Sequence, residues 1–413
     1  TNKKEREEMK EAVEKMNASQ KNRGPDDEGI FLTQINADKN AAIAMGHHRL
    51  SIIDLSKAGH QPMVFKRQGE SDKGKEIAIT FNGEIYNFLE LKKELEQKGY
   101  KFNTKTDTEI ILVLFAEYGE KSFAMLRGMF AFGLWDGKNQ KLFLVKDRYG
   151  IKPLYYYADD EKFIFASTVK AISESGLVLL QKNPEAYIGF LLFGSVPLPM
   201  TTIKNVLAVP AGHYLVRETD GRQKLVKYYD PLDFFLKKES ITNHQSPITK
   251  VRAFLEESVN FHLISDAPLG VFLSGGLDSS AIAALSAEAL REGGAGRRIT
   301  TLSVVFDEKE FSEEYYSDLV AKKIGSDHRK IKITEQDFYD SLDEVFEVMD
   351  QPTIDGVNTF FIAKAAKRAG LKTVLSGLGA DEIFLGYPHF RRAELLRKIQ
   401  KLPKILKSPL KLG

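Results

Sequence analysis

Hydrophobic and polar positions in the first part of the chain follow the pattern of short β-strands. Between residues 31 and 166, runs of apolar or alternating residues predict strands at 42–45, 77–81, 129–135, 141–146 and 162–166. Helices are predicted at 3–17, 87–98 and 107–118, the first as a charged surface helix. Asn87 and Glu90 have the spacing of a capping pair for the second helix. Strands interrupted by few helices predict packed α+β layers.

The pattern changes after residue 250, where apolar strands and amphipathic helices alternate. Strands are predicted at 269–273, 300–306, 330–333 and 371–375, with helices at 248–263, 279–291, 312–324, 335–349 and 357–369. Such alternation predicts an α/β doubly wound parallel sheet, whose ligands bind at the carboxyl ends of strands. The polar, proline-bearing stretch between the two parts reads as a connector. We therefore expect domains at 1–218 and 250–413, with 219–249 between them.

Composition narrows the class of protein. A chain of 413 residues is too long for one ordinary core, which supports two domains. With 59 basic and 57 acidic side chains, the net charge of +2 argues against a nucleic-acid or membrane-surface protein. The sequence contains neither an apolar run of membrane-spanning length nor a signal peptide, so we expect a cytoplasmic protein. Cysteine is absent, which excludes a thiol nucleophile or a thiolate metal site in this chain.

The stretch SGGLDSS, residues 274–280, has the character of a phosphate-binding loop. Gly275 and Gly276 let backbone N–H groups close on an anion, and the start of the following helix attracts negative charge. Ser274 and Ser279 add hydroxyl donors. The loop has no lysine and so does not match GxxxxGK[ST]. Asp278 would repel phosphates unless a cation lay between, so we interpret it as a Mg²⁺ ligand. A plain turn capped by Asp278 is the alternative.

A second loop repeats this design after the strand at 371–375. Ser376-Gly377-Leu378-Gly379 is followed by a helix that opens with Asp381 and Glu382. Carboxylates at the mouth of a second anion-binding loop would complete a Mg²⁺ shell with Asp278. The alternative is that both acids only favour the helix dipole. That alternative accounts well for acidic residues after a single loop. It accounts less well for two loops that share the same arrangement of glycines, serines and acidic residues.

Several further motifs appear in an order that resembles a known family. They are RGPDDEG (23–29), HHRLSIID (47–54), FNGEIYN (81–87), TDTE (106–109), GMFAFGLWD (128–136) and DRYGIKPLYY (147–156). With the two loops, which resemble those of the N-type ATP pyrophosphatases, they resemble glutamine-hydrolysing asparagine synthetases over most of residues 22–390. The resemblance implies a class II glutamine amidotransferase domain of the Ntn hydrolase type, followed by a synthetase domain.

The resemblance assigns roles to residues of the first domain. It makes Arg49 the clamp on the α-carboxylate of glutamine and has Glu84 and Asp107 hold the α-amino group. Asn82 and the Gly83 N–H would form the oxyanion hole. Each residue has a plain alternative: Asp107 as a helix cap, Arg49 in a surface ion pair, and Asn82-Gly83 as a hairpin turn.

For the synthetase domain, the resemblance implies that ATP and Mg²⁺ are the cofactors. ATP would contact Leu273, Ser274, Gly275, Gly276, Ser279, Val304, Ser376 and Gly377, with Asp278 and Asp381 on the metal ion. Aspartate would attack the α-phosphorus of ATP to give an acyl-adenylate and pyrophosphate, and ammonia would then displace AMP. The expected partners are small-molecule substrates, and neither nucleic acid nor a membrane is expected. The sequence leaves open whether the protein forms a homodimer.

Three departures qualify this resemblance. The family's glutaminase uses an N-terminal cysteine, whereas Thr1 leads straight into a charged helix. We therefore interpret the N-terminal strand as missing and predict that this chain releases no glutamate from glutamine. Leu378 replaces the usual glutamate and cannot do acid-base work, which leaves the acyl acceptor open. The chain ends at Gly413 without the family's later helices and catalytic lysine. The sequence therefore also leaves open a tRNA-modifying pyrophosphatase and a non-catalytic nucleotide or glutamine sensor.

Overall fold

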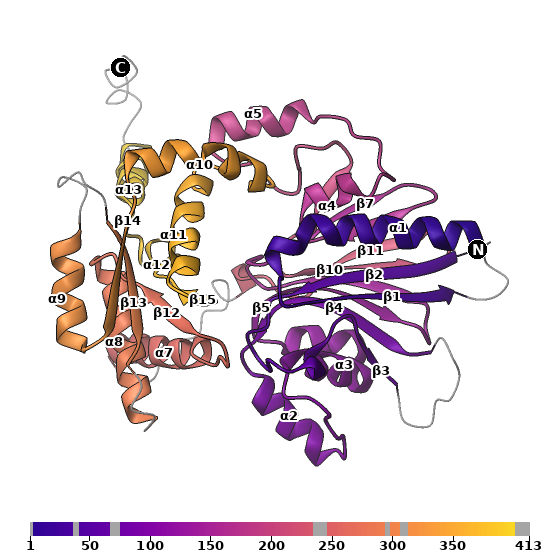
Figure 1. The fold of residues 1–413 in the computed structure, drawn as a ribbon, viewed down its shortest axis with the longest axis horizontal. Coiled ribbons are helices and arrows are strands. Elements are labelled where there is room, and N and C mark those ends of the chain that lie inside the picture. The colour runs from indigo at the N-terminus through magenta and orange to yellow at the C-terminus, as the bar shows by residue number, and fades with distance from the viewer. Residues whose placement is uncertain are drawn as a thin grey trace. The chain divides into compact units, whose positions relative to one another are not determined.

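The computed structural model describes residues 3–35, 41–66, 75–233, 246–293, 298–305 and 313–400. The chain divides into two compact units (Figure 1). The first comprises Thr1–Pro268 and Glu335–Lys364, and the second comprises Leu269–Thr334 and Ala365–Gly413. Thr1, residues 234–245 of the expected connector and the residues beyond Gln400 lie outside the described residues. None of the described helices is long and apolar enough to cross a membrane.

Antiparallel strands and flanking helices build the first unit. Its six-stranded sheet has the order β11-β10-β6-β5-β4-β3, and smaller sheets pair β1 with β2 and order β8-β7-β9. The strands are β1 (Asp27–Ile35), β2 (Ala41–Arg49), β3 (Met63–Phe65), β4 (Ile77–Ile85), β5 (Gly128–Asp136), β6 (Lys141–Lys146), β7 (Tyr155–Ala158), β8 (Phe163–Ala166), β9 (Val206–Ala208), β10 (His213–Glu218) and β11 (Gln223–Lys227). The helices are α1 (Lys3–Gln20), α2 (Phe88–Gln97), α3 (Asp107–Tyr118), α4 (Val169–Glu174), α5 (Pro184–Phe193), α7 (Pro247–His262), α10 (Glu335–Val348) and most of α11 (Gly356–Arg368).

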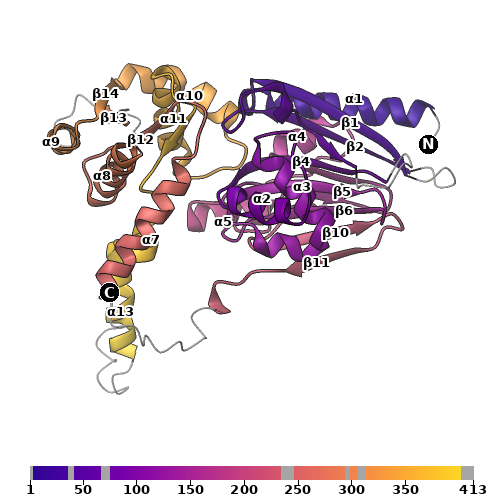
Figure 2. The ribbon, with the colours of Figure 1, turned by 90° about the horizontal axis from the view of Figure 1, so that it is seen from below.

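The layers follow from the sequence pattern. Helix α1 runs along β1 and β2 (Figures 1 and 2), and its apolar residues Ala12 and Met16 are buried. Helix α3 packs on β4 and is apolar on nearly every side, which is typical of a helix that is buried all round. Its residues Ile110 to Phe115 are each no more than 3% exposed. The predicted α+β layers of the first part are confirmed.

One predicted feature of this unit is wrong. Asn87 precedes α2 but its side chain does not cap the helix. The Asn87 amide instead donates to the Met125 carbonyl at 3.0 Å and accepts from the Arg127 N–H at 2.9 Å. A long-range contact with the segment before β5 therefore replaces the local contact that the spacing predicts. Helix α3 has a local cap, because the Thr106 hydroxyl accepts from the Thr108 N–H.

Residues 335–364 follow the strands of the second unit in sequence yet belong to the first unit. The Asp350 carboxylate accepts from the Val169 N–H at 2.9 Å and the Lys170 N–H at 2.8 Å, at the start of α4. The Gln351 side chain bonds both the N–H and the hydroxyl of Thr202. These contacts bring the segment against the start of α4 and the stretch that leads to β9.

The second unit is a parallel sheet with the order β14-β13-β12-β15. Its strands are β12 (Leu269–Phe272), β13 (Thr300–Val305), β14 (Asp327–Lys332) and β15 (Thr373–Leu375), and its helices are α8 (Leu277–Glu292), α9 (Glu314–Ile324), α12 (Ala380–Phe384) and α13 (Pro388–Gln400). The chain adds strands on one side of β12 first and then returns to place β15 on the other side. The topological switch point, where ligands of such sheets bind, is therefore between β12 and β15. The predicted α/β doubly wound class is confirmed.

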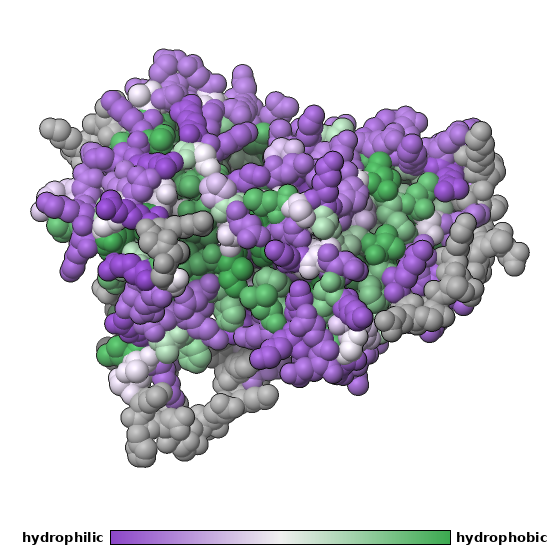
Figure 3. All heavy atoms as spheres, turned by 60° about the horizontal axis from the view of Figure 1, so that its bottom comes forward, coloured by the Kyte–Doolittle hydropathy of each residue, from purple (hydrophilic) through white to green (hydrophobic). Residues whose placement is uncertain are grey.

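Apolar side chains also reach the surface. Leu191, Leu192 and Phe193 at the end of α5 are each at least 70% exposed. Figure 3 shows apolar patches on an otherwise mostly hydrophilic face of the molecule.

Candidate functional site

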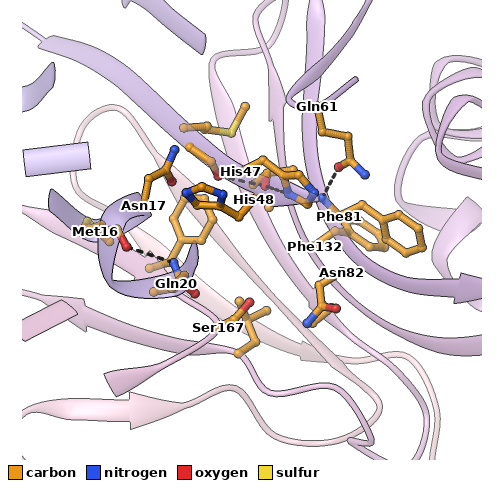
Figure 4. Close-up of a pocket in the computed structure, with 18 of the residues that line it drawn as sticks. Met16, Asn17, Gln20, His47, His48, Gln61, Phe81, Asn82, Phe132 and Ser167 are labelled. Atoms are coloured by element: carbon orange, nitrogen blue, oxygen red, sulfur yellow. Dashed lines mark hydrogen bonds between the residues drawn. The ribbon is translucent and has the colours of Figure 1, made fainter. Parts of the chain in front are cut away.

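A cavity of about 500 Å³ opens within the first unit between β2, β4, α1 and β8 (Figure 4). Arg49, Asn82, Gly83, Glu84 and Asp107 all line it. The motifs that supply these residues are up to 58 positions apart in sequence, so tertiary packing alone brings them together. The cavity thus gathers every residue that the sequence singled out for glutamine recognition.

Arg49 ends β2 and is only 6% exposed. Its guanidinium donates to the carbonyls of Ser56 at 2.9 Å, Ile53 at 3.1 Å and Asp54 at 2.5 Å. A Cβ at Gly59 would overlap the guanidinium, so that position leaves room only for glycine. The loop after β2 therefore fixes the plane of Arg49, which is what a two-pronged carboxylate clamp requires. The alternative of a surface ion pair is wrong.

Asn82 and Gly83 lie in the middle of β4 and pair with Ala131 and Phe130 of β5, so they do not form a hairpin turn. Gly83 has a φ of +151°, and a Cβ there would overlap the Met129 carbonyl. Only glycine fits, and this conformation fixes the direction of the Gly83 N–H. The Asn82 side chain is drawn among the residues that line the cavity in Figure 4. The two residues can therefore present neighbouring donors to one oxygen.

Two acidic side chains occupy the same wall. The Asp107 carboxylate accepts from the Ile85 N–H at 2.8 Å and from the Thr106 hydroxyl at 3.2 Å, so Asp107 joins α3 to β4 instead of capping the helix. The Oε1 of Glu84 is buried and has no hydrogen-bond partner among the described residues. Burial, with the charge of Asp107, raises the pKa of Glu84 to about 7, and burial raises the pKa of Asp107 to about 6. A buried carboxylate without a partner favours a cationic ligand group.

Sequence reasoning missed four other polar residues of this cavity: His47, Gln61, Arg23 and Lys152. His47 precedes Arg49 by two positions in one strand, so alternation was the available signal. The side-chain Oε1 of Gln61 accepts a hydrogen bond from the Phe81 N–H at 2.7 Å, which steadies β4. Burial lowers the pKa of Lys152, while the nearby charge of Glu84 opposes that change. Arg23 lies in the motif RGPDDEG and Lys152 in DRYGIKPLYY, and neither motif by itself predicts a role for these two residues.

In the second unit, the first predicted loop follows β12. The Ser274 hydroxyl lies 3.0 Å from the Ser279 hydroxyl and accepts from the Gly276 N–H at 3.2 Å. Gly275 has a φ of +92°, and a Cβ there would come within 2.8 Å of the Ser317 backbone nitrogen. Helix α8 begins at Leu277, two residues before the predicted start, so Asp278 lies in its first turn. The free N–H groups at this helix start lie next to the loop, and anion binding there stays a prediction.

The second predicted loop lies against the first. An ideal Cβ on Gly377 would lie 3.1 Å from both the Asp278 Cβ and the Ser279 nitrogen. The missing side chain of Gly377 thus permits the close approach of the two loops at the switch point. Gly379 has a φ of +99° and directly precedes α12, which carries Asp381 and Glu382 in its first turn. The Ser376 hydroxyl accepts from the Leu378 N–H at 3.2 Å.

A Mg²⁺ ion held by Asp278 and Asp381 together with phosphate stays a prediction. Within the described ranges, no group of three or more His, Asp and Glu side chains is arranged to hold a metal ion. Asp278 and Asp381 would supply one or two ligands each, and phosphate oxygens and water would complete the shell, as is usual for Mg²⁺. The Asp381 side chain lies beside Gly386, where a Cβ would overlap it.

Leu273 and Val304 flank this site on neighbouring strands. The Leu273 N–H donates to the Leu302 carbonyl at 2.9 Å, and the Leu273 carbonyl accepts from the Ser303 hydroxyl. A carbonyl has a second lone pair, so the Leu273 oxygen can still accept from an adenine amino group. Val304 pairs with Ile331 of β14 within the sheet.

Comparison with known families defines the class of protein. Residues 1–229 match the model of a glutamine amidotransferase domain, and residues 250–411 match the model of asparagine synthase. The chain therefore joins an α+β glutamine amidotransferase domain to an α/β asparagine synthase domain with a parallel sheet.

Three curated relatives identify the family. A Methanocaldococcus jannaschii protein with the provisional name asparagine synthetase [glutamine-hydrolyzing] 2 is 35% identical over 97% of this chain and 77% of its own length. Asparagine synthetase [glutamine-hydrolyzing] 1 of Bacillus subtilis is 34% identical, over 97% of this chain and 60% of its own. Amidase chry2 of Gibberella zeae is 32% identical, over 93% and 56%. The chain belongs to the glutamine-hydrolysing asparagine synthetase family.

Proposed function

We propose that the chain provides the glutamine-binding and ATP-binding sites of an ATP-dependent amide ligase of the asparagine synthase (glutamine-hydrolysing) type. Glutamine is the nitrogen donor, and aspartate is the carboxylate that becomes asparagine. The observation that carries the proposal is the shared cavity of Arg49, Asn82, Gly83, Glu84 and Asp107. The meeting of two phosphate loops at Gly377 supports the ATP half.

The wall of the cavity matches the groups of an amino acid. Arg49, held flat by three carbonyls, pairs with the α-carboxylate through its charge and its remaining N–H donors. Glu84 and Asp107 pair with the α-ammonium group, which supplies the cation that Glu84 lacks. The Asn82 amide and the Gly83 N–H hold the side-chain carbonyl oxygen of glutamine. The chain contains no cysteine, so we keep the prediction that it binds glutamine without hydrolysing it.

The switch point of the second unit matches the phosphates of ATP. Helix α8 and the loops around Ser274, Gly276 and Ser376 surround the pyrophosphate and the α-phosphate with N–H and hydroxyl donors. Asp278 and Asp381 would hold Mg²⁺, which supplies neutralisation of phosphate charge. The aspartate carboxylate oxygen attacks the α-phosphorus while the bond to the pyrophosphate oxygen breaks. Ammonia then attacks the acyl carbon, AMP leaves and a proton is lost.

Two titrations and one activity assay test this proposal. Isothermal titration calorimetry should show saturable binding of glutamine, lost in Arg49→Ala, and of Mg·ATP, lost in Asp278→Asn. Continued pyrophosphate release should require aspartate and ammonia together, because ammonia clears the acyl-adenylate that aspartate forms. Absence of glutamine and ATP binding by the unmodified chain would contradict the proposal. Binding without pyrophosphate release would instead support a nucleotide and glutamine sensor.

A second candidate acceptor is a carboxylate other than aspartate. Leu378, which stands where a glutamate is usual in the family, lies in the second loop and is 88% exposed. Relatives of comparable identity carry the name amidase. Pyrophosphate release with other amino-acid or peptide carboxylates in place of aspartate would favour this candidate.

A further inference from the structure

His47 and Arg49 reach the cavity from the same side of β2. Side chains alternate along a strand, and Gly46 faces α1, where a Cβ would overlap Asn17. His47 therefore faces the opposite way, toward β4, and its Nδ1 lies 3.0 Å from the Thr80 hydroxyl oxygen. Arg49, two residues on, shares that side.

Hydrogen bonding fixes which nitrogen of His47 carries the proton. The Thr80 hydroxyl donates its single proton to the Gly46 carbonyl at 3.1 Å. Thr80 can then only accept from His47, so Nδ1 bears the hydrogen and Nε2 carries a lone pair. His47 lines the cavity, and its only hydrogen bond to another described residue is the one through Nδ1. The lone pair of Nε2 is free to accept from a ligand.

The ring is also held neutral. Burial lowers the pKa of His47 to about 3, and the charge of Arg49 acts in the same direction. The other charged or titratable groups that act on the ring are His48 and His60, which also lower this pKa, and Asp27, which raises it. At any ordinary pH the ring is therefore an acceptor at Nε2 and not a second donor.

Spacing places this acceptor at the far end of an amino acid held by Arg49. Two residues along a strand are about 7 Å apart. The α-carbon and the carboxamide carbon of glutamine are separated by three carbon–carbon bonds, roughly 4 Å, with hydrogen-bond reach at either end. β4 repeats the arrangement, since Glu84 and Asn82 are also two residues apart on the cavity side. Each strand thus offers one residue to the α-carbon end and one to the side-chain end.

We propose that His47 is a specificity-determining residue whose Nε2 accepts a hydrogen bond from the carboxamide N–H₂ group of glutamine. The inference rests on the proposed glutamine site. A carboxamide offers N–H donors to the lone pair of Nε2. A carboxylate or an ester offers only oxygen acceptors, whose lone pairs would repel the lone pair of Nε2. His47 therefore rejects glutamate, the product of glutamine hydrolysis, and accepts the amide.

L-glutamate γ-methyl ester is the sharpest probe, because it keeps the side-chain carbonyl and loses both N–H donors. Calorimetry should show that the unmodified chain binds glutamine at least about tenfold more tightly than the ester or glutamate. In His47→Phe, glutamine binding should fall about tenfold while the ester keeps its affinity within about twofold. His213→Phe, at a half-buried histidine of β10 that does not line the cavity, is the matched control and should keep the ratio.

Thr80 provides a second and gentler variant. Thr80→Val removes the group that fixes the tautomer and should narrow the glutamine-to-ester ratio, while Thr80→Ser should restore it. The His47 contribution to the ratio should stay constant from about pH 5 to 8, since the ring does not titrate there.

Three results would overturn the inference. Equal binding of glutamine and the ester by the unmodified chain would do so, and so would an unchanged ratio in His47→Phe and Thr80→Val. In both cases glutamine still binds, so the proposed function would stand. Failure of glutamine itself to bind the unmodified chain would overturn both.

Discussion

Replacing Glu84 by glutamine should flatten the pH dependence of the first unit's stability. The folded-state pKa of about 7 lies above the ordinary value of 4.5. Between these values the unfolded chain has lost a proton that the folded chain retains, so stability falls as pH rises. Each pKa unit is about 1.4 kcal/mol, so the carboxylate costs about 3 kcal/mol at pH 8 and nothing below pH 4. Glu84→Gln removes this cost, because an amide remains neutral throughout.

A single reporter makes the measurement specific to this unit. Trp135 is the only tryptophan of the chain, lies in β5 and is 2% exposed. Urea unfolding followed by its fluorescence should show that Glu84→Gln is more stable than the unmodified chain at pH 8 and equal to it near pH 4. Glu90→Gln, at an exposed position of α2, is the control and should follow the unmodified chain. Parallel pH profiles for Glu84→Gln and the unmodified chain would refute the reasoning.

The same carboxylate should link ligand binding to protons. An α-ammonium group beside Glu84 favours the ionised carboxylate and lowers its pKa from about 7. Glutamine binding at pH 7 should therefore release protons. The affinity for glutamine should increase as the pH rises from about 6 to 8. Calorimetry in two buffers of different ionisation enthalpy measures this release directly, and Glu84→Gln should abolish it.

Three further substitutions test the local geometry. Gly83→Ala should destabilise the first unit by about 2 kcal/mol or more in the Trp135 assay, since its Cβ overlaps the Met129 carbonyl; unchanged stability would show that β4 can shift. Arg49→Lys should weaken glutamine binding about tenfold or more by calorimetry, because an ammonium lacks the planar fork that three carbonyls orient, and equal affinity would argue for a simple point charge. Gly377→Ala should weaken Mg·ATP binding, because the new Cβ forces the two loops apart. Gly293→Ala is the control and should leave this binding unchanged, since the nearest atom to its new Cβ is 3.5 Å away. Similar losses of affinity in both variants would point to general destabilisation.

Local sequence pattern predicts those parts of the fold whose cause is local. The long apolar run of α3 predicts a buried helix. The alternation of strands and helices in the part of the chain that contains Asp278 and Ser376 predicts the parallel sheet. The side chain of Asn87 does not follow, because Met125 and Arg127, nearly forty residues away, provide better partners than the helix start. Residues 335–364 likewise read as helices of the second part, yet Asp350 and Gln351 find their partners at α4 and Thr202 of the first unit. Long-range partners decide these cases, and single-sequence pattern does not contain them.

The candidate site shows the same division between local and long-range causes. The resemblance of their motifs to a known family assigned Arg49, Asn82 and Glu84 to glutamine binding, and these roles stay predictions although the cavity brings the three residues together. His47 and Lys152 are missed because their roles arise only when β2 faces β4 across the cavity. The two-residue period of a strand nevertheless constrains the result, since Arg49 implies a cavity-facing residue at 47 and Glu84 implies one at 82. Two facing strands, each offering a pair of residues about 7 Å apart, suffice to read both ends of one small amino acid. In the proposed glutamine site, β2 and β4 therefore carry most of the recognition, while α3 supplies Asp107 and part of the buried core.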